Sequence, residues 1–92
     1  LRDRVRDCRA ELVITQDEGR RGGKPIPLKA VVDEALEGEA AVKNVLVYRH
    51  TAGAVAMKPG RDHWWQDLVP AEPPTHTAVP CAAEDPLFIL YT

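Results

Sequence analysis

The sequence contains no serine, two cysteines and a single methionine. The lack of serine excludes a serine nucleophile, and neither Cys8 nor Cys81 has a histidine at a spacing that suits a cysteine nucleophile. The cysteines are far apart, and His50, His63 and His76 are too widely spaced for a local metal-binding motif. The sequence therefore predicts no catalytic residue and no metal ligand.

The chain also lacks a long apolar run and an excess of positive charge. Apolar residues make up 45% of it and charged residues 28%, which is a globular composition, and no apolar run approaches the ~20 residues of a membrane helix. The formal net charge is -2, which argues against nucleic-acid binding by bulk electrostatics. We therefore expect a cytoplasmic protein without nucleic-acid or membrane partners, in which two free thiols are favoured over one disulfide.

The first half of the chain alternates between helix and strand patterns. Leu1 to Cys8 has one apolar helical stripe, and Leu12 to Thr15 is a β-branched run typical of a strand. After a loop at Gln16 to Pro27, Leu28 to Leu36 has the spacing of an amphipathic helix, and Val45 to Tyr48 predicts a second strand. This order predicts an α/β fold with a mostly parallel sheet, flanking helices and a βαβ-type unit.

The second half contains weaker patterns before a strong last one. Thr51 to Met57 is interpreted as a small hairpin, and Gly60 to Val69 as a helix that Asp62 caps. Residues 70–86 hold five of the eight prolines and predict an extended connection, not a second domain. The unbroken apolar run from Leu87 to Tyr91 predicts a central strand of a parallel sheet, buried on both faces.

One basic loop is the best candidate for a binding site. Arg20, Arg21 and Lys24 surround Gly22-Gly23, a pair that lets the backbone curl and expose its amides beside fixed positive charge. Such a curl can bind an anion, and an arginine can grip a phosphate with two parallel hydrogen bonds. The loop lacks the spacing of a Walker phosphate loop. A phosphate group is the expected ligand, although a basic glycine turn is also a common surface feature.

Other candidate groups favour structural roles. Trp64-Trp65 could stack on a base, but core packing is the favoured interpretation. The arginines of the first helix are interpreted as a solvated face in preference to an anion site. An outward position on or just beyond the second helix is expected for four acidic residues, which are Asp33, Glu34, Glu37 and Glu39.

Three stretches carry a resemblance to a known family. They are Ile14 to Leu28, Gly60 to Leu68 and Glu84 to Thr92, of which the last resembles the segment that leads into the phosphate loop of adenylate-forming enzymes. All three follow the order found in the acetyl-CoA synthetase family, so the resemblance covers essentially the whole chain. It implies that residues 1–92 are a fragment of an N-terminal adenylate-forming domain that stops just before the ATP phosphate loop.

The resemblance implies a ligase that converts acetate, ATP and CoA to acetyl-CoA, AMP and pyrophosphate through acetyl-adenylate. The positions that match the family's CoA 3′-phosphate site are Arg21, Gly22, Gly23 and Lys24, whereas the ATP and Mg²⁺ sites lie outside this chain. Lys24 stands where many relatives have arginine, which keeps the charge but loses the bidentate fork. The fragment is expected to supply scaffold and a CoA-binding loop to the remainder of the parent chain, and to be inactive alone.

Two alternatives stay open at this point. The parent enzyme could activate propionate or another short-chain acid, because the acid pocket lies outside these residues. The chain could instead be a stand-alone binding or interaction module that reuses the same unit. An unpaired parallel strand at its end argues against this second alternative, because an open strand edge promotes aggregation.

Overall fold

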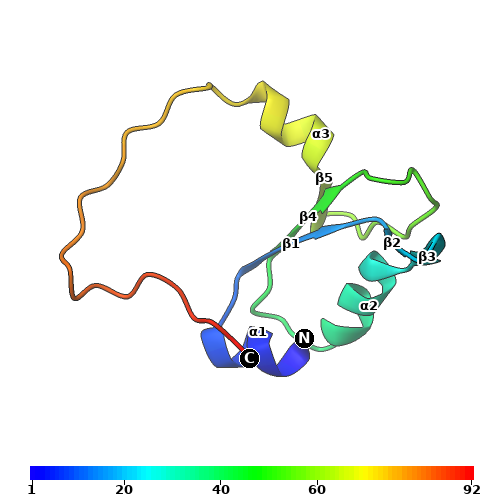
Figure 1. Cartoon of the computed structure of the whole chain (residues 1–92), viewed down its shortest axis with the longest axis horizontal. Coiled ribbons are helices and arrows are strands. Elements are labelled where there is room, and N and C mark those ends of the chain that lie inside the picture. The colour runs from blue at the N-terminus through cyan, green and yellow to red at the C-terminus, as the bar shows by residue number, and fades with distance from the viewer.

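The computed structural model describes all 92 residues and divides them into a packed region, residues 1–71, and a C-terminal segment, residues 72–92. The elements of the packed region in chain order are α1 (Arg2–Cys8), β1 (Leu12–Gln16), β2 (Gly19–Arg21), β3 (Lys24–Ile26), α2 (Leu28–Ala35), β4 (Asn44–Tyr48), β5 (Asp62–Trp64), α3 (Trp65–Leu68) and the 3-10 helix η1 (Val69–Ala71). The C-terminal segment contains no helix or strand (Figure 1).

Three strands form a parallel sheet in the order β1-β4-β5. β1 and β4 pair along their whole length, from Leu12 opposite Asn44 to Gln16 opposite Tyr48. The chain passes between them through β2, β3 and α2, because a parallel pair requires a crossover that returns the chain to the same end of the sheet. The predicted α/β class, with its parallel sheet, flanking helices and βαβ unit, is therefore confirmed.

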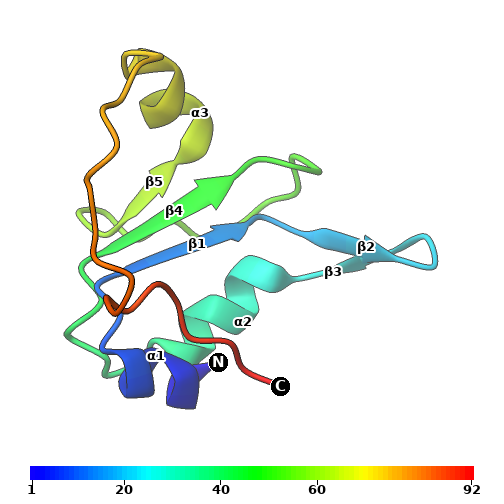
Figure 2. The ribbon, with the colours of Figure 1, turned by 60° about the vertical axis from the view of Figure 1, so that its left-hand side comes forward.

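The hydrophobic core lies on one face of this sheet. Successive side chains of a strand point to opposite faces, so Val45 and Val47 of β4 both point inward, and both are completely buried. Val32 of α2, Leu36 directly after α2 and Val5 of α1 pack into the same cluster. Figure 2 shows α1 and α2 together on one side of β1, where they cover this face.

The opposite face of the sheet is open. Leu12 and Ile14 of β1 and Tyr48 of β4 point to it, with exposed fractions of 52%, 59% and 43%. Trp65, the first residue of α3, meets the Tyr48 ring edge-on, with 6.0 Å between ring centroids and 72° between ring planes. The sheet thus has one packed face and one that presents apolar side chains to solvent.

The predicted second helix is present as α2. Pro27 precedes it, and Gly38 beyond its end adopts a φ of +77°, which glycine tolerates without strain. The prediction that the apolar stripe of this helix is buried is only partly correct, because Val31 is 49% exposed. Lys29, which the pattern did not single out, is 1% exposed instead.

The predictions for Thr51 to Val69 are largely wrong. Residues 51–57 form no hairpin. The interpretation of Gly60 to Val69 as one helix fails because Asp62 to Trp64 pair with β4 as strand β5, and only Trp65–Leu68 are α-helical. Asp62 caps no helix, since it is buried within the sheet. Asp62 to Trp64 become a strand because β4 offers them an edge to pair with. The local sequence of Asp62 to Trp64 does not predict this pairing.

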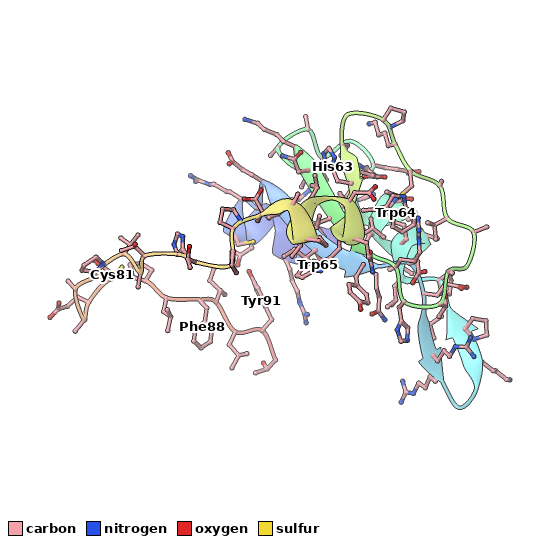
Figure 3. All side chains as sticks on the ribbon, turned by 90° about the horizontal axis from the view of Figure 1, so that it is seen from above. His63, Trp64, Trp65, Cys81, Phe88 and Tyr91 are labelled. Atoms are coloured by element: carbon pink, nitrogen blue, oxygen red, sulfur yellow. The ribbon has the colours of Figure 1, made fainter.

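The predicted central strand at Leu87 to Tyr91 is also wrong for this chain. Leu87, Phe88 and Leu90 are 87%, 71% and 77% exposed, and no strand lies beside them. The segment leaves η1, loops away from the packed region and returns to α1, where the Tyr91 hydroxyl donates a hydrogen bond to Asp7 (Figure 1). Figure 3 shows Phe88 and Tyr91 on the C-terminal segment. An apolar run without a hydrogen-bonding neighbour does not form a strand.

None of the helices combines the length and the apolar character that are needed to cross a bilayer.

Candidate functional site

The basic loop predicted between Gln16 and Pro27 is a β-hairpin. β2 and β3 pair antiparallel, with Arg21 opposite Lys24 and Gly19 opposite Ile26. Gly22 and Gly23 form the two-residue turn with φ values of +57° and +78°. Two positive φ angles are the requirement of a type I′ turn, whose twist matches that of the paired strands. The glycine pair therefore closes a hairpin that extends beyond the end of β1 (Figure 2).

The cationic side chains of Arg20, Arg21 and Lys24 lie on two different faces of the hairpin. Arg21 and Lys24 are direct cross-strand partners, so their side chains leave the same face next to each other. Arg20 is opposite Pro25 and therefore points to the other face. All three cations are exposed, and none forms an ion pair. Two uncompensated positive charges at a rigid turn are an arrangement that suits an anionic group.

The hairpin tip lies on an open surface. None of the surface hollows in the molecule is lined by Arg21, Gly22, Gly23 or Lys24. The largest hollow, of about 480 Å³, lies between α2 and the loop that precedes β5. A ligand at the tip would therefore be held from one side, by charge and hydrogen bonds.

The root of the hairpin is organised by Asp17, which the sequence did not single out. Its side chain is fully buried and has no cation beside it. It accepts four backbone N–H hydrogen bonds, from Glu18, His50, Thr51 and Ala52. Burial alone would raise the pKa of Asp17, but these hydrogen bonds outweigh it and hold the pKa below its ordinary value.

A second buried cluster joins α2 to β5. The Lys29 ammonium lies 2.7 Å from Asp33 and 2.8 Å from Asp62, and it also donates to the Ala56 carbonyl at 2.8 Å. Arg61 bridges the same two carboxylates at 2.6 Å each. Asp33 was expected to face outward, so that prediction is wrong. Because every charge here has an opposite partner, the cluster is a structural link and leaves no group free for a ligand.

These contacts also shift the pKa values of the second cluster. Burial works to raise the pKa of Asp62, but hydrogen bonds from Arg61, Lys29 and the Lys58 N–H lower it to about 2. The hydrogen bond to Asp62 and the one to Asp33 raise the pKa of Arg61, against the effect of its own burial. Asp62 is therefore ionised throughout the physiological range.

The arginines of α1 are mainly structural. Arg2 donates to the carbonyl oxygens of Ala35 and Glu34 at the end of α2, at 2.9 and 2.6 Å. Arg6 pairs with Glu39 at 2.6 Å, so Glu39 was also wrongly expected to face outward. These contacts fix α1 against α2, and they occupy two of the cations that an anion would need.

The remaining candidates have no ligand site. Trp64 packs against the core, as favoured from the sequence, and Arg49 lies over its ring at 4.2 Å from the centroid. Trp65 does not join the core cluster and contacts Tyr48 on the open face instead. Cys8 and Cys81 are free and exposed. No group of three or more His, Cys, Asp or Glu side chains lies close enough to hold a metal ion.

Sequence comparison identifies relatives that match the whole chain. No protein-family model matches it. Curated relatives described as acetyl-coenzyme A synthetase match all 92 residues, including those of Nostoc linckia at 52% identity, Xanthomonas axonopodis pv. citri at 55% and Cupriavidus pinatubonensis at 52%. The chain spans 27% of the length of the first and 14% of the other two. Identity above 50% over all 92 residues shows that the chain belongs, as a segment, to the acetyl-coenzyme A synthetase family.

Proposed function

We propose that this chain acts as part of an acetyl-coenzyme A synthetase, within an N-terminal adenylate-forming domain. The complete enzyme would convert acetate, ATP and CoA to acetyl-CoA, AMP and pyrophosphate through acetyl-adenylate. Support comes from identity above 50% over the whole chain to relatives of that description. A cytoplasmic location belongs to the same proposal and fits two exposed, unpaired cysteines.

The role proposed for these residues is to bind the 3′-phosphate of CoA at the hairpin tip. The observation that carries it is the cross-strand pair of Arg21 and Lys24 on either side of Gly22-Gly23, exposed and without any acidic partner. A phosphate could take two parallel hydrogen bonds from the Arg21 guanidinium and one from the Lys24 ammonium. The glycines leave the tip without side chains, so the ligand can approach the backbone closely.

ATP and Mg²⁺ would be held elsewhere in the complete enzyme. The chain offers no cluster of metal-ligating side chains, and its carboxylates at Asp33 and Asp62 are already paired with Lys29 and Arg61. These residues would therefore take no direct part in the chemical steps. The 92-residue chain alone is expected to release no AMP from ATP and acetate.

The test uses two neighbouring arginines that differ mainly in the face they occupy. In the 92-residue chain, Arg21→Ala should weaken CoA binding by on the order of tenfold, because charge-assisted hydrogen bonds to a phosphate are lost. Arg20→Ala removes the same charge from the other face and should weaken binding less than about threefold. Binding is followed by two-dimensional amide NMR during titration with CoA.

A second ligand makes the test specific for the 3′-phosphate. Titration with 3′-dephospho-CoA should leave the amide signals of Arg21 to Lys24 unmoved, whereas CoA should shift them. If both ligands move these signals equally, or if Arg20→Ala and Arg21→Ala have the same effect, the assignment of the 3′-phosphate to this face is wrong. The acid specificity of the complete enzyme is then a separate question, answered by comparing acetate with propionate in an adenylation assay.

A further inference from the structure

Asp17 is the junction at which three separate segments meet. Its own N–H donates to the Tyr48 carbonyl at 3.0 Å, which continues the β1-β4 pairing by one residue. Its carbonyl accepts from the Lys29 N–H at 3.2 Å, which holds the first turn of α2. Its carboxylate collects the backbone N–H groups of residues 50–52, between 2.9 and 3.2 Å. One buried residue therefore fixes the end of β1, the loop after β4 and the start of α2 relative to each other.

The loop after β4 is shaped around this carboxylate and its neighbour. Ala52 adopts a φ of +59°, a conformation that a residue with a side chain rarely takes, and its N–H is the group bonded to Asp17 at 2.9 Å. Glu18 accepts a hydrogen bond from the Thr51 hydroxyl at 2.6 Å. A Cβ atom at Gly53 would overlap the Glu18 carboxylate, which would have to move away to make room for it. The loop is thus held in one conformation by Asp17 and Glu18 together.

The hairpin tip has no support of its own. No atom lies within 4 Å of the positions that a Cβ would take at Gly22 or Gly23, whereas a Cβ at Gly19 would come within 3.1 Å of Leu28. The hairpin is therefore packed at its root and free at its tip. Three residues of strand place the tip roughly 10 Å from the root. A rotation of about 10° at the root would then displace Arg21 and Lys24 by nearly 2 Å, more than a directed phosphate contact tolerates.

We propose that Asp17 is a positioning residue for CoA, which holds the cationic hairpin in the orientation that meets the 3′-phosphate. This inference rests on the function proposed above. Asp17 itself does not touch the ligand, since its carboxylate is completely buried and all of its acceptor directions are used by backbone N–H groups. For the same reason it does not act as a general base. Its effect reaches the ligand through the geometry of the hairpin root.

The test is carried out in a complete synthetase that contains this segment. Asp17→Asn keeps the size of the side chain but replaces one acceptor oxygen with an NH₂ donor that faces backbone N–H groups. The KM for CoA should rise by on the order of tenfold, while the KM for ATP and for acetate stays unchanged. The KM for 3′-dephospho-CoA should rise much less, because that ligand makes no contact with the tip. Asp3→Asn, on the exposed face of α1 and without any partner, is the matched control and should change none of these values.

A double variant of Asp17 and Arg21 distinguishes a positioning role of Asp17 from a general loss of structure. If Asp17 acts through the hairpin tip, Asp17→Asn combined with Arg21→Ala should raise the KM for CoA by less than the product of the two single effects, because Arg21→Ala has already removed part of the contact that Asp17 positions. A general structural defect would multiply the two effects and lower kcat as well. Thr51→Val removes a hydroxyl that donates to Glu18 and accepts from the Gly53 N–H, and it should raise the KM for CoA by a smaller factor. This variant keeps the test available if Asp17→Asn does not fold.

The outcomes distinguish the two proposals. If Arg21→Ala leaves the KM for CoA unchanged, the proposed phosphate site is wrong, and the role of Asp17 is wrong with it. If Arg21→Ala raises that KM but folded Asp17→Asn and Thr51→Val do not, the phosphate site stands and the positioning role is refuted. Equal increases in KM for CoA, ATP and 3′-dephospho-CoA would likewise refute it.

Discussion

Two apolar runs of similar composition adopt different structures in this molecule. Val45 to Tyr48 forms the central strand of the sheet, paired with β1 on one side and β5 on the other, and two of its valines are completely buried. Leu87 to Tyr91 is at least as apolar, yet it is extended, unpaired and exposed to solvent. Its only fixed point is Tyr91, which contacts Asp7 and Arg4 of α1.

The difference lies in what surrounds each run. β4 follows a crossover that returns it beside β1, with α2 in place to cover the inner face. The C-terminal segment reaches its apolar run after a proline-rich stretch without a neighbouring strand. Burial of apolar surface stabilises a strand only when its backbone N–H and C=O groups are also paired. An apolar run therefore indicates that a strand is possible, and backbone pairing with a neighbouring strand decides whether it forms.

The largest effect that distinguishes the two regions is expected from a carboxylate. Asp62→Ala in the packed region removes a partner from both Lys29 and Arg61, which leaves a buried ammonium with less compensation. We expect a loss of about 3 kcal/mol in the free energy of unfolding. Urea unfolding monitored by the fluorescence of Trp64 and Trp65 measures it, since both indoles lie in the packed region.

The control for this prediction is a carboxylate of the C-terminal segment. Glu84 is exposed and forms no ion pair, so Glu84→Ala should change the free energy of unfolding by less than about 0.5 kcal/mol. Equal effects of Asp62→Ala and Glu84→Ala would mean that the buried cluster contributes little, and the contrast between the regions would then rest on apolar packing alone.

A smaller loss of stability is expected when one apolar side chain in each of the two runs is replaced by alanine. Val47→Ala removes two methyl groups from a fully buried site and should lower the free energy of unfolding by about 2 to 3 kcal/mol. Leu87→Ala removes more apolar surface from a side chain that is 87% exposed, and it should change stability by less than about 0.5 kcal/mol. A loss at Leu87 as large as that at Val47 would show that the C-terminal segment is packed in solution.

The fold could be predicted where local patterns and topology agree. Helix, strand, helix and strand in the first half admit few arrangements, and the parallel pair of β1 and β4 follows from them. β5 could not be predicted in this way, because Asp62 to Trp64 is a strand only by virtue of the edge that β4 offers. Leu87 to Tyr91 fails for the opposite reason: its pattern is strong, but it pairs with neither open edge of the sheet, β1 or β5.

The candidate site also has a part that local sequence signals predict and a part that they miss. The tip of the hairpin was visible in the sequence because Gly22-Gly23 between cations is a local signal, although the turn was read as a loop and not as a hairpin. Asp17 and Lys29 were missed because their partners are distant in the chain, at residues 50–52 for one and at Asp62 for the other. A charged residue directly after a strand, at the edge where parallel strands end, was the one signal that pointed to Asp17.

The smallest of the expected effects is a loss of stability in acid that is confined to the packed region. The pKa of Asp62 is lowered to about 2 from an ordinary value of 3.8, so the folded chain favours the ionised form more than the unfolded chain does. The stabilisation is therefore complete above pH 4 and is lost as the pH falls toward 2, at a cost of up to about 2 kcal/mol. Free energies of unfolding measured between pH 7 and pH 2 should be level down to pH 4 and then decline. In Asp62→Asn the decline should be shallower, because the titrating group is gone. If the decline were equally steep in Asp62→Asn, other carboxylates such as Asp17, whose pKa is also lowered, would account for the acid sensitivity instead.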